Sequence, residues 1–191
     1  MLLSALLVTG ARLEAGALDL PIGSSWGDPP GKLIDWGTEK KAEVAIILPP
    51  EKPDWRYVKV RTDDARVLDA GFVTEVEGRY FQGQLVEIAL TQRDPKLTST
   101  VVKARFLKEK RLYARRYGTF KVNRRTSANQ NNFSTNSLSY HVEPLPGLFL
   151  LLTHTEMEDQ LRQVREGRFS VIFRNENLLK ELQKPKPQLN P

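Results

Sequence analysis

Apolar residues in this chain occur in short runs that are separated by glycine and proline, and this pattern is typical of β-strands rather than of long helices. Val58 and Val60 alternate with charged residues, as in a strand with one buried face. Gly78 and Gly83 mark a turn or bulge between two further runs. The first 90 residues are therefore expected to be mostly β, with strands at 43–48 (a buried strand), 56–61, 72–78 and 84–90.

Two segments near the N-terminus need a separate interpretation. Residues 20–37 are rich in Gly, Pro and Ser, which predicts a loop. Trp26 and Trp36 are expected to pin this loop onto the core, although two such rings could also form a stacking surface. Residues 2–9 form a short apolar run with no basic segment before it, so we expect a first core strand there. An uncleaved or truncated export signal is the alternative.

Residues 98–118 are compatible with a helix or a strand. In a strand, Val102 and Phe106 would share one face and alternate with basic residues. In a helix, the same two residues would share a face with two tyrosines, and Gly118 would follow a basic last turn. A basic last turn followed by glycine suits both the C-terminal cap and the helix dipole, so we expect a helix over 101–117.

The sequence pattern in the last third of the chain predicts several strands and one short helix. Residues 126–139 carry no charge and little apolar bulk, which indicates a mobile loop or hairpin tip. Residues 155–158 (TEME) fit a capping box, and the apolar spacing after them predicts a helix that ends at Gly167. Strands are expected at 119–125, 148–152 and 168–173.

This order of elements predicts an α+β fold in which an antiparallel sheet carries its helices on one face and is connected by long loops. A ferredoxin-like unit is one concrete form of such a fold. The length of 191 residues suits one domain and is too short for a barrel of eight strand–helix units, which needs about 250 residues. We expect a single domain over residues 1–183 and a Pro-rich, extended tail over residues 184–191.

The positive charge of the chain is concentrated in one segment. Residues 103–125 contain ten Lys or Arg residues, and Glu109 is their only acid, so the segment carries +9. Because the whole chain has a net charge of +6, the remaining residues together carry −3. Concentrating one sign of charge costs self-repulsion, which a polyanionic partner would relieve. The charge pattern therefore predicts a polyanion as partner, with anionic lipid or an acidic protein as alternatives.

Aromatic residues lie between these charges. Arginine binds phosphates bidentately, and tyrosine rings can stack on unpaired bases. Phe106 and Phe120 are expected to face the core, whereas Tyr113 and Tyr117 could either stack on bases or pack inside. The candidate nucleic-acid-binding residues are Lys103, Arg105, Lys108, Lys110, Arg111, Tyr113, Arg115, Arg116, Tyr117, Lys121, Arg124 and Arg125.

Signals of catalysis are poor in the sequence. The chain has no cysteine, which excludes disulfides, thiolate metal sites and cysteine nucleophiles. It has no Walker-type loop and no G-x-G-x-x-G motif. His141 and His154 are 13 positions apart, a spacing that matches no common metal site. We therefore expect no catalytic residue, no metal site, no cofactor and no enzymatic activity.

Residues 122–126 (VNRRT), 140–144 (YHVEP) and 146–149 (PGLF) follow one another in a recognisable layout. The segment 119–152 resembles the RAMP superfamily of CRISPR effector subunits. In that family a strand ending in polar-Arg-x-Thr leads into a variable loop, and a strand ending in Val-x-Pro-x-Gly precedes an apolar strand and a helix. The family has ferredoxin-like cores that line up along a guide RNA. The resemblance implies RNA contact by Arg124 and Arg125 and assigns no catalytic residue.

The principal hypothesis is a non-enzymatic, RNA-facing nucleic-acid-binding subunit of a larger ribonucleoprotein such as a CRISPR effector complex. Its partners would be RNA or another single-stranded nucleic acid and other protein subunits, not a membrane, and its place would be the cytoplasm. One alternative is an envelope or membrane-associated accessory protein whose basic face meets anionic lipid or an acidic partner. Residues 55–58, 140–143 and 167–171 are similar in order to a group of bacterial membrane-anchored proteins. Another alternative is a phage or virion structural protein.

Overall fold

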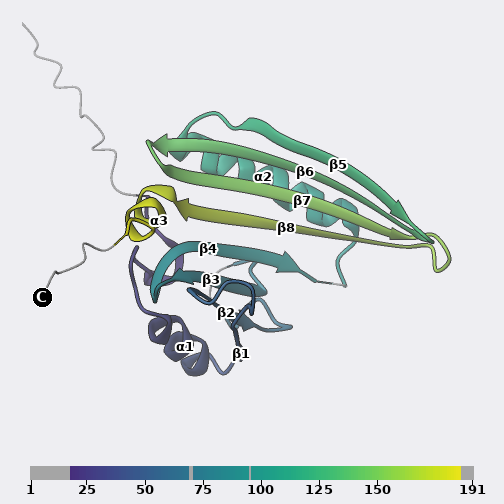
Figure 1. Cartoon of the computed structure of the whole chain (residues 1–191). Coiled ribbons are helices and arrows are strands. Elements are labelled where there is room, and N and C mark those ends of the chain that lie inside the picture. The colour runs from purple at the N-terminus through teal and green to yellow at the C-terminus, as the bar shows by residue number, and fades with distance from the viewer. Residues whose placement is uncertain (1–17, 69–70, 95, 186–191) are drawn as a thin grey trace, which may run out of the picture.

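The computed structural model describes residues 18–68, 71–94 and 96–185. In these parts of the chain, eight strands form one antiparallel sheet in the order β1-β2-β3-β4-β8-β7-β6-β5 (Figure 1). The strands are β1 (Glu43–Ile47), β2 (Trp55–Arg61), β3 (Glu75–Phe81), β4 (Gln84–Arg93), β5 (Lys121–Gln130), β6 (Phe133–Leu145), β7 (Leu148–Asp159) and β8 (Val164–Asn175). The helices are the 3₁₀-helix η1 (Pro21–Gly23), α1 (Pro30–Glu39), α2 (Ser99–Tyr117) and α3 (Glu176–Leu182).

The two halves of the sheet have the same topology. In each half a helix precedes four strands that pair in chain order, first α1 with β1–β4 and then α2 with β5–β8. The last strands of the two halves, β4 and β8, pair antiparallel in the middle, with Leu90 opposite Val171. The edge strands are therefore β1 and β5, the first strand of each half. The α+β class is confirmed, but the ferredoxin-like unit is not, because the sheet is larger.

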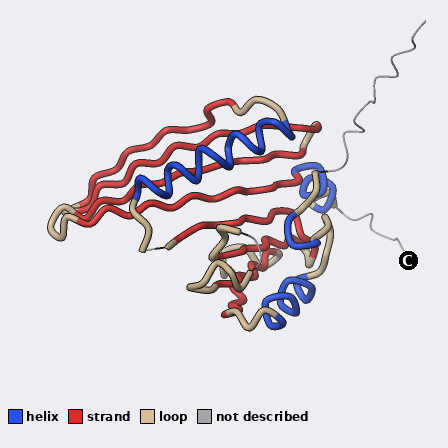
Figure 2. The backbone as a smooth tube through the Cα atoms, turned by 180° about the vertical axis from the view of Figure 1, so that it is seen from behind, coloured by secondary structure: helices blue, strands red, loops and turns tan. Residues whose placement is uncertain are grey.

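One face of the sheet holds the hydrophobic core. Side chains alternate between the two faces of a strand, and the register places Val60, Val76, Leu90, Val171 and Leu152 side by side on one face. All five are buried. Both α1 and α2 pack on this face, which we call the helix-covered face, and Figure 2 looks onto α2. The expectation of helices on one face holds for these two long helices.

The opposite face of the sheet, which we call the open face, is mixed, because polar side chains lie there beside a row formed by Ala89, Ile172 and Leu151. Thr91 and Ser170 point to it from β4 and β8, and their hydroxyl groups lie 2.9 Å apart. Ser137 and Thr155 form the same kind of contact between β6 and β7, also at 2.9 Å. The short helix α3 follows β8 and lies at the end of the strands (Figure 1). Among the described residues, no helix is both long and apolar enough to cross a membrane.

The loop predicted over residues 20–37 holds for residues 24–29, but helix α1 takes its place from Pro30 onward. Pro30 occupies its first turn, where proline has no hydrogen bond to lose. The helix approaches the sheet at two glycines. A Cβ atom on Gly37 would lie 2.8 Å from side-chain atoms of Val44 and Val60, and one on Gly78 would lie 2.8 Å from Leu33. Pro30 and Gly37, which indicated a loop, therefore start the helix and allow it to pack closely on the sheet.

Helix α2 confirms the expected helix over 101–117. The N–H of Val101 donates a hydrogen bond to the Thr98 hydroxyl at the N-terminal cap, and Gly118 follows the last turn with a positive φ. Val102 and Phe106 are buried against the sheet, and so is Phe120 just after the helix. The expected core positions of both phenylalanines are thus confirmed.

The helix predicted after residue 155 is wrong. Strand β7 continues to Asp159, and β8 begins at Val164. The Asp159 carboxylate accepts hydrogen bonds from the backbone N–H groups of Leu161 and Arg162, which fixes a tight turn between the strands. Apolar residues that suggested helical spacing therefore lie on two strands and a turn.

Three other expectations hold only in part. Strand β1 is an edge strand, so Ile46 and Ile47 of the predicted buried strand are exposed. Gly83 lies in the turn between β3 and β4 as expected, whereas Gly78 lies inside β3, and the bulge of this strand pair falls just after it, between Arg79 and Tyr80. The segment 126–139 is a hairpin tip rather than a mobile loop, because β5 and β6 pair up to Gln130 and Phe133.

The expected strand at residues 2–9 lies outside the described residues. The domain extent of 1–183 and the tail at 184–191 stay predictions, because residues 1–17 and 186–191 are not described.

His154 lies under α2 rather than before a helix, with its ring centroid 5.2 Å from that of Phe106. Burial lowers its pKa, and Lys103 adds to this effect, while Glu156 acts in the opposite direction. The unfolded chain therefore binds more protons as the pH falls through about 6.5, and the folded state loses stability on acidification. We expect the free energy of unfolding to fall more between pH 7 and 5 for the wild type than for His154→Gln. Urea denaturation at both pH values tests this, and equal losses would contradict it.

Candidate nucleic-acid interface

The ten cations of residues 103–125 lie on two neighbouring elements. Seven are on α2, and Lys121, Arg124 and Arg125 are on β5. Because Val102, Phe106 and Tyr113 face the sheet, positions three to four residues apart on the other side of α2 face outward. We call the exposed residues Arg105, Lys108, Arg111 and Arg115 the α2 basic face. At 1.5 Å per residue, this stripe is about 15 Å long.

Most of these cations lack a negatively charged partner. Of the ten, Arg116 alone forms an ion pair within the described residues, with Asp19. Among the described residues outside the segment, at least eight cations are ion-paired, and these include Lys32, Lys59, Arg66, Arg79, Arg162, Arg165, Arg174 and Lys180. The segment thus differs from the rest of the described surface in its pairing as well as in its composition. Its positive charge stays available to an external anion.

Some of the cations make contacts that fix their position. The Lys110 ammonium lies 3.5 Å from the centroid of the Tyr140 ring, and the Arg111 Nε donates a hydrogen bond of 3.2 Å to the Leu107 carbonyl. Burial raises the pKa of Glu109, against the opposing effect of Lys108.

The three cations of β5 do not all join the α2 basic face. Arg125 is opposite Leu138, which in turn is opposite His154 under α2, so Arg125 is on the helix-covered face. Arg124 is opposite Ser139, one position further along β6, and therefore points to the open face. Lys121 is also on the open face. The structure brings Lys103, Arg105, Lys108, Lys110, Arg111, Arg115 and Arg125 to one side of the sheet and separates Lys121 and Arg124 from them.

The two tyrosines of α2 face the core. The Tyr113 ring stacks on Tyr117 with centroids 6.1 Å apart and contacts Phe173 edge-on at 6.2 Å. Burial raises the pKa of Tyr113 to about 12. The Arg116 guanidinium lies 5.2 Å from the Tyr117 ring centroid. Both rings are half-buried, so base stacking by Tyr113 and Tyr117 stays a prediction, and phosphate contact is what the geometry offers directly.

The sequence reasoning missed two features of the surface. Val101, Leu107 and Leu112 are exposed on α2 between its cations, and their positions off the core stripe of the helix were the available signal. The other is a charged row on the open face centred on Glu87. Its signal was a lone acid inside the apolar run LVEIAL of β4.

No family model matches the chain, and a search of curated proteins finds no match to it. Among the described residues, no three His, Asp or Glu side chains are grouped closely enough to hold a metal ion.

Proposed function

We propose that this chain is a non-enzymatic subunit that binds the phosphate backbone of single-stranded nucleic acid, RNA in the first place, through the α2 basic face. The observation that carries the proposal is the set of nine cations in residues 103–125 that have no ion-pair partner among the described residues. Seven of them are on the side of the sheet that α2 covers, with Lys103, Lys110 and Arg125 beside the basic face. An extended polyanion neutralises such a surface, whereas a small acidic ligand would reach only part of it.

The chemistry of the basic face suits phosphate rather than base recognition. Three of its four residues are arginines, whose planar guanidinium groups bind two phosphate oxygens at once. Phosphate contacts position a nucleic acid without reading its sequence. We therefore expect binding that depends little on base sequence and strongly on salt.

The resemblance to RAMP subunits supports a narrower form of this proposal. Residues 119–152 include β5 and β6, of which β6 contacts α2, and the resemblance assigns RNA contact to Arg124 and Arg125. In that form the chain is one protein subunit of a cytoplasmic ribonucleoprotein. Because Arg124 and Arg125 point to opposite faces, a single strand that touches both would pass over the exposed edge of β5.

The proposal is tested by titrating fluorescent single-stranded RNA, matched single-stranded DNA and duplex with the purified chain at 50 and 200 mM salt. With about five neutralised phosphates, the affinity for a single strand should fall roughly 100-fold between these concentrations. RNA of two unrelated sequences should bind with similar affinity. Binding that is unchanged by salt, or an absence of binding by the folded chain, would contradict the proposal.

The exposed apolar residues of α2 favour one second candidate, an anionic membrane surface. Val101, Leu107 and Leu112 lie between the cations, as in helices that rest on a lipid interface. This candidate predicts sedimentation with vesicles that contain phosphatidylserine, and loss of binding when Leu107 and Leu112 are replaced by serine. Nucleic-acid binding would survive these two replacements, so the same variant separates the two functions.

A further inference from the structure

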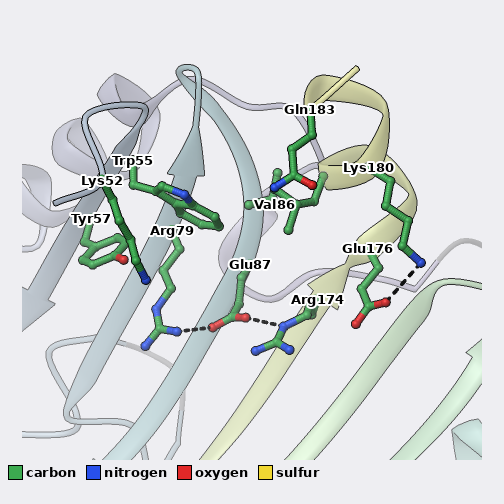
Figure 3. A pocket seen from close by; sticks show the side chains of 11 residues that line it. Lys52, Trp55, Tyr57, Arg79, Val86, Glu87, Arg174, Glu176, Lys180 and Gln183 are labelled. Atoms are coloured by element: carbon green, nitrogen blue, oxygen red, sulfur yellow. Dashed lines mark hydrogen bonds and ion pairs between the residues drawn. The ribbon is translucent and has the colours of Figure 1, made fainter. Parts of the chain in front are cut away.

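Four neighbouring strands place one side chain each in a row across the open face. Tyr57 on β2 is opposite Arg79 on β3, Arg79 is opposite Glu87 on β4, and Glu87 is opposite Arg174 on β8. Figure 3 shows the two guanidinium groups on either side of the Glu87 carboxylate. The side chain of Glu87 is 6% exposed, whereas those of the two arginines are 40% and 37% exposed. One buried carboxylate thus holds two accessible guanidinium groups in place.

The two arginines keep donors that no described residue uses. The Arg79 Nη1 lies 2.8 Å from Glu87 Oε1, and its Nε donates a hydrogen bond of 2.7 Å to Glu77. Arg174 donates to Glu87 Oε2 through Nε, at 2.5 Å. A guanidinium group has five N–H donors. Within the described part of the chain, both terminal nitrogens of Arg174 and the Nη2 of Arg79 have no ion-pair or hydrogen-bond partner.

These donors line a cavity of about 250 Å³. Trp55 and Tyr57 lie on one side of it, and Gln183, which directly follows α3, lies on another (Figure 3). The Trp55 ring contacts the rings of Phe81 and Tyr57 edge-on, with centroids 5.3 and 6.2 Å apart, so its position is fixed by packing. The cavity therefore combines a cationic floor with an aromatic wall, and its volume suits a small molecule.

The charge of the lining favours a dianion. Lys52, Arg79, Arg174 and Lys180 contribute four positive charges, and Glu87 and Glu176 contribute two negative ones, which gives +2. Lys180 is paired with Glu176 at 3.5 Å, and Glu77, outside the lining, is shared by Arg79 and Lys59, so the excess of the lining is on the Arg79–Glu87–Arg174 row and on Lys52. A phosphate monoester carries nearly two negative charges at neutral pH and matches this excess, whereas a carboxylate carries only one.

We propose that this cavity binds a small phosphate monoester that carries a flat ring. Its phosphate would lie at the free donors of Arg79 and Arg174, with Lys52 at the rim, and its ring would pack against Trp55. The cavity is on the open face, and the α2 basic face is on the other side of the sheet. The site is therefore distinct from the proposed nucleic-acid interface, and its occupancy does not depend on that proposal.

The test is a titration of the full chain with phenyl phosphate, inorganic phosphate, benzoate and phenol, followed by calorimetry and by the NMR signals of the arginine Nε–H groups. Phenyl phosphate should bind at least about tenfold more tightly than benzoate and more tightly than inorganic phosphate, with shifts at Arg79 and Arg174. Phenol should not bind. The absence of any shift at about 10 mM phenyl phosphate, or equal affinity for benzoate, would overturn the proposal.

Two variants locate the ligand. Arg174→Gln should weaken phenyl phosphate binding at least about tenfold while Arg79 still pairs with Glu87. Lys52→Gln removes a rim charge that forms no ion pair with a described residue, so it should weaken binding without affecting the fold. Lys121→Gln, on the open face but outside the cavity lining, is the matched control. Equal binding by all three variants would overturn the proposal, because the ligand would then sit elsewhere.

Discussion

Replacing Phe106 with alanine should lower the free energy of unfolding by about 3–5 kcal/mol. Phe106 is 2% exposed and lies between α2 and the sheet. Its ring contacts Tyr140 and Phe169, with centroids 6.1 and 6.0 Å apart. These residues come from β6 and β8, so the truncation leaves a cavity where the helix meets two strands that cannot close around it.

The measurement is urea denaturation, in which the midpoint should fall with little change in the slope. Leu112→Ala is the matched control, because Leu112 is on the same helix and 46% exposed. Its effect should stay within about 0.5 kcal/mol. Similar losses for both variants would contradict the packing of α2 on the sheet through Phe106.

Replacing the whole α2 basic face with glutamine should abolish most nucleic-acid binding. The helix-face variant carries Arg105→Gln, Lys108→Gln, Arg111→Gln and Arg115→Gln. Glutamine has nearly the helix propensity of Lys and Arg, and all four positions are exposed, so the fold should be retained. With the loss of four phosphate contacts, the affinity for single-stranded RNA at 0.1 M salt should fall at least about 100-fold.

A control variant with the same change in net charge separates local from global electrostatics. Lys41, Arg56, Arg61 and Lys96 are exposed and outside the 103–125 segment, and their replacement by glutamine also removes four positive charges. Its RNA affinity should change by less than about tenfold, because exposed charges more than a Debye length away are screened. Equal losses in the two variants would show that net charge, not the α2 basic face, governs binding.

The elements that sequence predicted correctly are those with local signals. Thr98 and Gly118 bracket α2, and both act through contacts a few residues away, so the helix could be identified without the rest of the fold. The helix predicted after residue 155 is wrong because local signals there conflict with the pairing of the strands. The apolar residues after residue 155 have helical spacing in the sequence, but an Asx-type turn at Asp159 places them in a hairpin.

The candidate site was predictable only in part. The concentration of charge is a property of the sequence, but which of the neighbouring Arg124 and Arg125 faces α2 depends on the register of β5 with β6. The Arg79–Glu87–Arg174 row could not be foreseen, because Glu87 and Arg174 are 87 positions apart and meet only when β4 pairs with β8. Long-range pairing of this kind leaves no local pattern.

The most direct test of the central claim is the salt dependence of RNA binding by the wild type and the helix-face variant. For the wild type, a plot of log K against log salt concentration should have a slope of about −3.5, which corresponds to five neutralised phosphates on a single strand. For the variant the slope should be flatter by about 3, because four of these contacts are removed. Equal slopes for the two proteins would contradict the assignment of the phosphate contacts to the α2 basic face.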